Sequence, residues 1–397
     1  MKNVSKAVAA DKAATATTAV VRTTATPAKR AVGKKTARTK ASQRKGASAA
    51  ARETIGIDLG DKVSRYAILD AAGELVEEGS FRNEVSSMEK HFGGDTKPAR
   101  IAMEVGTQSA WIERELKRMG HDVIVADARQ LAWITSSDTK NDRSDAEKLA
   151  RLARADLRLL KQVDHRTAEQ QAELNVIRAR DALVRVRTTL VNAARGLAKG
   201  FEGLRLPPAI TSLFGMHALK LVPEILKPAL SGLLAEIDAL TARVKEYDRQ
   251  IAVLAGQHKE VVFIQSIPGV GALSALTFAL TLGRAERFEH SRDVGAFFGM
   301  RPKQRQSGDC DPQLHISKAG DKYMRKLLVQ CAHHILGRFG KDSALRQWGL
   351  KIAQRGGKNA LKRAIVAVAR KLAVLMHRLW RKAEVFQPFP QTVSKAA

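Results

Sequence analysis

The stretch TIGIDLG, residues 54–60, decides the fold of this chain, because it is the first apolar, strand-like segment and it ends at the turn signal Gly60-Asp61. Two further segments of the same kind follow it, RYAILD at residues 65–70 and ELVEEGSF at residues 74–81. Three short strands joined by tight turns predict an antiparallel meander.

After the meander the pattern alternates between helix and strand. A helical segment near residues 86–92 precedes the strand RIAMEV at 100–105, and a helix near 110–119 precedes the strand DVIVAD at 122–127. Three antiparallel strands followed by alternating helices and strands predict an α/β layer arrangement. The order matches that of a ribonuclease-H-like domain, in which the first and fourth strands carry acids side by side.

Four acids fall on these elements and on the helix after them. Asp58 lies in the first strand, and Glu104 lies in RIAMEVGT. Asp142 and Asp145, in KNDRSDAEKLARLAR, are three residues apart at the start of a helical pattern, so both project from one helix face. Carboxylates converging from these elements would form an all-oxygen nest that suits Mg²⁺ or Mn²⁺.

Each acid alone has a simpler structural explanation. Asp58 is also explained as a turn residue, and Asp142 as the N-terminal cap of its helix. The full set, in order and on the appropriate elements, favours a metal site. In a chain of net charge +28, such a concentrated acidic nest indicates bound metal that works on phosphate.

The composition indicates a polyanionic partner. The chain has 397 residues, 68 Lys and Arg against 40 Asp and Glu, and a pI near 10.4. Nucleic acid fits this charge best, with an anionic membrane surface as the alternative. No apolar run approaches the roughly 20 residues of a membrane span, so we expect no membrane insertion. Cys310 and Cys331 are too few for a disulfide framework or a four-ligand zinc site, and a reducing, cytosolic compartment fits this cysteine usage.

The sequence divides into five parts. They are a disordered basic tail (1–52), a catalytic α/β domain (53–160), a helical coiled-coil or oligomerisation segment (161–258), a mostly helical C-terminal domain (259–385) and a short tail (386–397). The first tail is a low-complexity run of Ala, Thr, Lys and Arg that cannot bury a core. A nucleic-acid-coating arm and a dispensable extension explain it equally well.

The helical segment has a near-heptad seam. The spacing is seen at Leu234, Ile237, Leu240, Val244 and Tyr247. A break at LRLPPAI separates two long helices. An antiparallel hairpin packed on its own core and a dimerisation arm are both consistent with this pattern.

Two features of the C-terminal domain indicate contact with DNA. Gly269 and Gly271, in IPGVG before an apolar helix, predict a helix-hairpin-helix turn whose backbone N–H groups approach a phosphate. The alternative is an ordinary tight turn. Residues 338–382 are strongly basic and include an amphipathic helix, whose apolar face we expect in the core and whose basic face is either solvated or a backbone clamp.

A polar, basic loop holds two serines of interest. Ser307 lies in QSG, and Ser317 precedes Lys318 in HISKAG. From the residues alone, a serine in such a loop is more often a turn or phosphate-contact residue than a nucleophile. His315, His333 and His334 have no carboxylate partner at motif spacing, so a Ser-His-Asp triad is unsupported.

Taken together, GIDLG, MEVGT, KNDRSDAEKLARL, IPGVG, FFGMRP with QSG, HISKAG and GGKNALKRAIVAVARKL resemble the DEDD transposases of bacterial insertion-sequence family 110. The resemblance runs from about residue 54 to 382. It implies a RuvC-like domain whose metal set falls on Asp58, Glu104, Asp142 and Asp145. It also implies a C-terminal transposase domain whose DNA-attacking serine falls on Ser307, with Ser317 the less favoured choice.

The resemblance further implies site-specific recombination. A serine oxygen would displace a DNA 3′-hydroxyl and hold a covalent phosphoserine, with Mg²⁺ or Mn²⁺ assisting. The implied partners are the DNA of the element ends and target, a guide RNA, and further copies of the chain in a dimer or tetramer. Gly269, Gly271 and Lys318 are the expected DNA contacts.

Two other functions remain open. A RuvC-like Holliday-junction or structure-specific endonuclease would use the same acids with metal-activated water, and it would survive the loss of Ser307. A nucleoid-coating protein with purely structural acids would bind DNA without metal-dependent strand transfer.

Overall fold

The computed structural model describes residues 53–390 apart from positions 95, 128–141, 161, 309, 311 and 313, and for residues 142–144 it describes the backbone alone. The predicted basic tail and its nucleic-acid arm therefore lie outside the described residues, as does most of the predicted C-terminal tail. Within the described ranges, no helix is long and apolar enough to cross a membrane.

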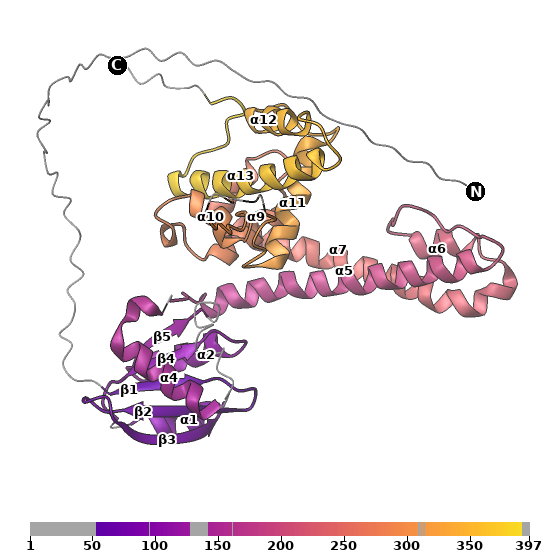
Figure 1. Cartoon of the computed structure of the whole chain (residues 1–397). Coiled ribbons are helices and arrows are strands. Elements are labelled where there is room, and N and C mark those ends of the chain that lie inside the picture. The colour runs from indigo at the N-terminus through magenta and orange to yellow at the C-terminus, as the bar shows by residue number, and fades with distance from the viewer. Residues whose placement is uncertain are drawn as a thin grey trace, which may run out of the picture. The chain divides into compact units, whose positions relative to one another are not determined.

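A five-stranded mixed sheet forms the first part of the described chain (Figure 1). Its elements in chain order are β1 (Thr54–Asp58), β2 (Val63–Leu69), β3 (Leu75–Arg82), α1 (Val85–Phe92), β4 (Arg100–Glu104), α2 (Ser109–Arg118), β5 (Asp122–Ala126) and α4 (Asp142–Ala155). The spatial order is β3-β2-β1-β4-β5, with antiparallel pairs on the β3 side and parallel pairs on the β5 side. The predicted meander and the predicted α/β alternation are thus confirmed.

The two faces of the sheet are covered by different helices. On one face, Ile57 and Met103 pack in a cluster with side chains of α1 and α2. On the other face, Ala102 and Ile124 pack with Leu149 and other residues of α4. Because strand side chains alternate between faces, every second residue of β1 and β4 faces α4.

The rest of the described chain is helical. Its helices are α5 (Ala168–Gly200), α6 (Phe214–Leu219), α7 (Lys227–Gln257), α8 (Lys259–Gln265), α9 (Ala272–Leu282), α10 (Arg292–Phe297), α11 (Lys322–Leu336), α12 (Ala344–Ala353) and α13 (Ala360–Lys382). A mixed sheet followed by many helices agrees with the predicted α/β domain and helical C-terminal part.

Helices α5 and α7 pack along each other and run in opposite directions. Arg180 Nε of α5 lies 2.6 Å from Asp248 Oδ1 of α7, and Arg187 Nη1 donates to Thr241 Oγ1 at 3.4 Å. The α7 number falls as the α5 number rises, which defines an antiparallel pair. Four of the five predicted seam residues are buried, and Tyr247 is half-buried. The apolar seam of α7 is therefore buried within the chain itself.

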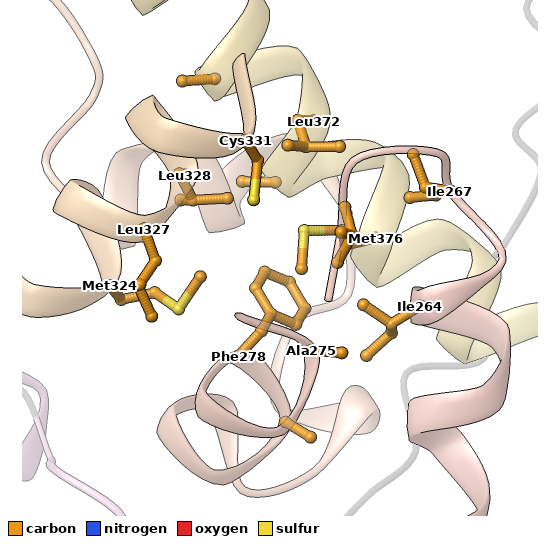
Figure 2. Packing of buried hydrophobic residues seen from close by; sticks show 14 of the residues in the cluster. Ile264, Ile267, Ala275, Phe278, Met324, Leu327, Leu328, Cys331, Leu372 and Met376 are labelled. Carbon is orange, nitrogen blue, oxygen red and sulfur yellow. The ribbon is translucent and has the colours of Figure 1, made fainter. Parts of the chain in front are cut away.

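The C-terminal helices share one apolar cluster around α9. Figure 2 shows Phe278 of α9 among side chains that include Met324 of α11 and Met376 of α13. Helix α13 is the predicted amphipathic helix. The expected apolar face consists of Ile365, Val368, Leu372 and Leu375; the first three are buried and Leu375 is half-buried. Lys and Arg side chains occupy the exposed face.

Candidate active site

Asp58 and Glu104 lie at the same edge of the sheet. Each is the last residue of its strand, and the parallel register pairs Ile57 with Met103 immediately before them. Both acids are half-buried. They are two residues beyond the paired Gly56 and Ala102, so strand alternation puts them on the face that α4 covers.

Helix α4 approaches β1 so closely that only glycine fits beneath it. A Cβ on Gly56 would lie 1.9 Å from the carbonyl oxygen of Ala146 and 2.6 Å from the amide nitrogen of Ala150. Both alanines are buried against the strand. Small residues on both elements therefore bring the helix backbone onto the strand backbone, close to the acid at the end of β1.

Helix α4 runs antiparallel to β1. Near its C-terminus, Arg151 Nη1 donates to the Gly73 carbonyl at 3.2 Å, and Arg154 Nη1 donates to the Asp70 carbonyl at 3.2 Å. That turn follows β2, which pairs antiparallel with β1, so the turn lies at the amino end of β1. The start of α4, at Asp142, consequently lies toward the carboxyl end of β1.

The two helix acids occupy this end of α4. Position 142 is one helical turn before Ala146, which faces β1, and so it belongs to the same helix face. The Asp145 side chain is 13% exposed and lies 3.3 Å from the ammonium of Lys148. The side chain of Asp142 falls outside the described residues. The structure thus brings the backbone positions of all four predicted acids to one edge and one face of the sheet.

The donor set at this edge fits a hard divalent cation, because carboxylate oxygens are the ligands that Mg²⁺ and Mn²⁺ prefer. Among the side chains that the structure describes, no three His, Cys, Asp or Glu residues converge closely enough to hold a metal. That set does not include the Asp142 side chain. The match between these residues and a divalent metal therefore rests on the strand register, the close approach of α4 and the oxygen donors.

A fifth acid at the same edge was not singled out from the sequence. Asp127 directly follows β5, whose register pairs Ala126 with Glu104, and it is only 8% exposed. The signal for it was present, because DVIVAD ends in an acid just as the first strand does.

A hydrogen bond joins the turn that follows Asp58 to the turn that follows Glu104. Gln108, just before α2, donates through Nε2 to the Asp61 carbonyl in the β1–β2 turn, and its Oε1 accepts from Trp111 Nε1 at 3.1 Å. Asn83 Nδ2 donates to the Gly60 carbonyl at 2.9 Å in the same turn. Sequence patterns could not predict these hydrogen bonds of the Gln108 and Asn83 side-chain amides, because the bonds join segments that are far apart in the chain.

Ser307 lies at the tip of a narrow hairpin between α10 and α11. Its backbone N–H donates to the Cys310 carbonyl at 3.1 Å, and the Cys310 N–H donates back at 3.1 Å. Gly308 has φ +54°, a left-handed conformation that suits glycine. Ser307 is exposed, and no hydrogen bond joins its hydroxyl to another residue of the described chain.

The base of this hairpin is held by main-chain hydrogen bonds. Lys303 N–H donates to the His315 carbonyl at 2.9 Å, and Ser317 N–H donates to the Arg301 carbonyl at 2.8 Å. The Ser317 hydroxyl accepts from the Ala319 N–H at 3.4 Å. Ser317 is thus a half-buried residue of the base, whereas Ser307 is presented to solvent beside exposed basic side chains.

The predicted PGVG turn joins α8 to α9. Gly269 has φ +91°, and a Cβ there would lie 2.8 Å from Cδ2 of His334 on α11. Gly271 is the residue immediately before α9. An open cavity of about 450 Å³ lies at this turn, with Ser274 and Gln330 also in its lining. The first N–H groups of α9 are available at this cavity because the residue before the helix provides no side-chain cap.

The fold and the acidic edge define the class of the protein together with two family matches. The mixed sheet and helical C-terminal part are consistent with a ribonuclease-H-like DEDD domain followed by a second, helical part. Residues 55–201 match a DEDD-type family described as "Transposase", and residues 262–348 match a family described as "Transposase IS116/IS110/IS902 family". The protein is a transposase.

Individual relatives agree over most of the chain. The chain is 30% identical over 303 residues to the transposase for insertion sequence element IS1328 of Yersinia enterocolitica, covering 74% of this chain and 87% of that one. It is 29% identical over 348 residues to the transposase for IS1111A of Coxiella burnetii, covering 84% and 91%. A probable family 20 transposase of Pseudomonas aeruginosa is 28% identical over 342 residues, covering 84% and 98%.

The chain belongs to the IS116/IS110/IS902 family of transposases. It is therefore a DNA-cleaving and DNA-recombining enzyme. Its DEDD-type domain suggests that the reaction depends on a divalent metal.

Proposed function

We propose that this transposase cuts and rejoins DNA through a covalent bond between Ser307 and a DNA phosphate. The observation that carries the proposal is the presentation of Ser307 at the tip of an exposed hairpin, where a phosphate can reach the hydroxyl. Ser317, the other serine of the loop, is half-buried at the hairpin base and its hydroxyl accepts a backbone N–H.

The chemistry follows from the hydroxyl group. Ser307 Oγ attacks the phosphorus, the bond from phosphorus to the DNA 3′-oxygen breaks, and that oxygen leaves as a hydroxyl after taking up a proton. A second 3′-hydroxyl then attacks the phosphoserine and releases the serine. One phosphodiester is exchanged for another, so the reaction needs no nucleotide cofactor.

The acidic edge would hold the divalent metal. Asp58, Glu104, Asp142 and Asp145 would supply the carboxylate oxygens, because their backbone positions lie toward one edge and one face of the sheet. A bound Mg²⁺ or Mn²⁺ would neutralise charge on the reacting phosphate and favour loss of the serine proton. The residues themselves contribute a fixed arrangement of oxygens, which the close packing of α4 on Gly56 supports.

The C-terminal domain would contact the DNA backbone. Gly269 and Gly271 form a helix-hairpin-helix turn in this proposal, and the cavity beside it exposes the N-terminus of α9 to a phosphate. Lys318 lies at the base of the hairpin that carries Ser307, with its own backbone at φ +57° and its N–H donating to the Gly299 carbonyl. A cation held there by the backbone would bind a phosphate near the nucleophile.

The proposal also includes the partners and the division of the chain. A guide RNA would select the DNA, and a dimer or tetramer would form through the segment 161–258, on a surface other than the seam that α7 buries within the chain. The catalytic parts would be residues 53–160 and 259–385. The surplus of Lys and Arg supports an RNA or DNA partner of this kind.

The test is a trapping experiment in bacteria that carry the gene between its native flanks. Lysis in strong denaturant would preserve a covalent protein–DNA adduct from the wild type. We expect the adduct to disappear in Ser307→Ala and in Asp58→Asn, because the first lacks the nucleophile and the second lacks a metal-binding carboxylate. Ser317→Ala is the matched control and should retain the adduct.

Two results would contradict the proposal. An adduct that persists in Ser307→Ala would exclude this serine as the attachment point. DNA cleavage by Ser307→Ala with no adduct in any variant would instead identify a nuclease that uses metal-activated water.

A further inference from the structure

The hydroxyl of Ser109 closes the turn that follows Glu104 in the chain. Glu104 ends β4 and Ser109 begins α2, so four residues connect the acid to the helix. The Gly106 N–H donates to Ser109 Oγ at 3.1 Å, and Ser109 Oγ donates to the Gly106 carbonyl at 2.8 Å. The hydroxyl therefore fixes the backbone two residues beyond the acid.

A histidine from a distant segment holds this serine in place. His165 Nε2 lies 2.9 Å from Ser109 Oγ, and Ser109 is completely buried. The one hydroxyl proton already goes to the Gly106 carbonyl, so the histidine must be the donor in this contact. The result is a directed chain of hydrogen bonds from His165 through Ser109 to the turn behind Glu104.

The surroundings favour one form of the imidazole ring. Burial lowers the pKa of His165, while the nearby Glu113 carboxylate, 3.9 Å from Nε2, acts in the opposite direction. The positive charges of Arg166, Arg114 and Lys117 lower its pKa further. These effects favour the neutral ring, and the contact with Ser109 places a proton on Nε2.

The segment that carries His165 is anchored independently of the turn. Val163 N–H donates to the Val125 carbonyl of β5 at 2.8 Å. Arg166, the next residue after the histidine, donates to the Leu280 carbonyl at 2.5 Å and the Thr281 carbonyl at 3.2 Å, at the C-terminal end of α9. A histidine fixed on both sides in this way can determine where the serine lies.

From these contacts we infer that His165 is a positioning residue for Glu104 in the metal site. It donates a hydrogen bond to Ser109, and Ser109 holds the turn that sets the backbone of the acid. The inference rests on the proposed function, because it presumes that Glu104 binds the metal. The inference makes metal affinity depend on His165 in addition to the four acids.

The test measures metal binding directly. Purified full-length protein, freed of metal with a chelator, would be titrated with Mn²⁺ in a calorimeter, and binding absent from Asp58→Asn would define the site. We expect His165→Ala to weaken Mn²⁺ binding about tenfold, as is typical when a residue that orients a ligand is lost. His165→Gln should stay within about threefold of the wild type, because its side-chain amide can donate to Ser109 in place of Nε2.

His121→Ala is the matched control. His121 is also a buried histidine of this domain, bonded to the Phe92 carbonyl at 2.6 Å and the Ala99 N–H at 3.2 Å, but it lies at the opposite, amino end of β5. The His121→Ala substitution should lower the melting temperature and leave Mn²⁺ affinity unchanged. This result would separate a loss of stability from a loss of positioning.

The outcomes are distinguishable. Wild-type binding that Asp58→Asn abolishes and His165→Ala leaves unchanged overturns this inference alone. Equal weakening by His165→Ala and His121→Ala would also overturn it, because the effect would then be general destabilisation. A wild-type protein that binds no Mn²⁺ would overturn the metal part of the proposed function and this inference with it.

Discussion

The α carbon of Gly56 lies so close beneath Ala146 that a methyl group on it would come within 1.9 Å of the Ala146 carbonyl oxygen. This contact sets the depth at which α4 packs on β1. Asp58 lies two residues beyond the glycine, and position 142 lies one helical turn before the alanine. A glycine with no catalytic atom therefore governs the spacing between the strand acid and the helix acids.

Gly56→Ala should destabilise the protein and reduce recombination. The new methyl group meets backbone atoms, which cannot rotate away, and overpacking of this kind costs about 1–3 kcal/mol. Urea denaturation of the full-length protein would measure the loss. Gly106→Ala, where a Cβ meets nothing within 4 Å, is the control and should cost much less. Equal stability of Gly56→Ala and wild type would show that α4 does not pack as described.

The edge that carries the acids could be predicted because its determinants are local. Alternating apolar residues define β1 and β4, and an acid ends each strand. Parallel neighbours share a carboxyl edge, so Asp58 and Glu104 had to meet once β1 and β4 paired. The same reasoning would have found Asp127 at the end of β5. The spacing of Asp142 and Asp145 was equally local, since helical periodicity alone places them on one face.

The supporting contacts could not be predicted because they join segments far apart in the chain. His165 meets Ser109 across 56 residues, and Gln108 meets Asp61 across 47. No residue pattern around either partner specifies the other. The hairpin of Ser307 was likewise seen only as a polar, basic loop, since its pairing depends on backbone hydrogen bonds that any residue but proline can make.

Arg166→Ala should lower the free energy of unfolding by about 2 kcal/mol, because charge-assisted hydrogen bonds to otherwise unpaired helix carbonyls are lost. The guanidinium is bonded to the Leu280 and Thr281 carbonyls at the end of α9. Chemical denaturation followed by circular dichroism would measure the change. Arg158→Ala, whose side chain is 91% exposed, should have little effect. A loss no larger than that of Arg158→Ala would show that these bonds do not stabilise α9.

The protein should lose stability as the pH falls below about 6.5, and His377 should contribute to this loss. His377 is fully buried between the Ser291 hydroxyl and the Ala285 carbonyl, and burial lowers its pKa below the ordinary 6.5. The unfolded chain therefore binds the proton more readily, so stability is complete above pH 6.5 and falls as the pH drops toward the lower folded pKa. Melting temperatures between pH 5 and 8 should fall less steeply for His377→Gln. An identical slope in both proteins would contradict this role.

The conformation of Gly308 should matter for catalysis and not for stability. Its φ of +54° lies in the left-handed region, where alanine is disfavoured by about 1–2 kcal/mol and asparagine is better tolerated. No atom lies within 4 Å of a Cβ built there, so an added side chain meets no steric obstacle. Gly308→Ala should therefore reduce adduct formation by Ser307 about five- to thirtyfold, because a strain of this size lowers the population of the native hairpin tip by that factor. Gly308→Asn should remain within about threefold of the wild type.

Both variants should melt at the wild-type temperature, since the tip is exposed and contributes little to the core. If both variants form the adduct at the wild-type rate, the geometry of the tip does not limit the reaction, and the hairpin only carries the serine.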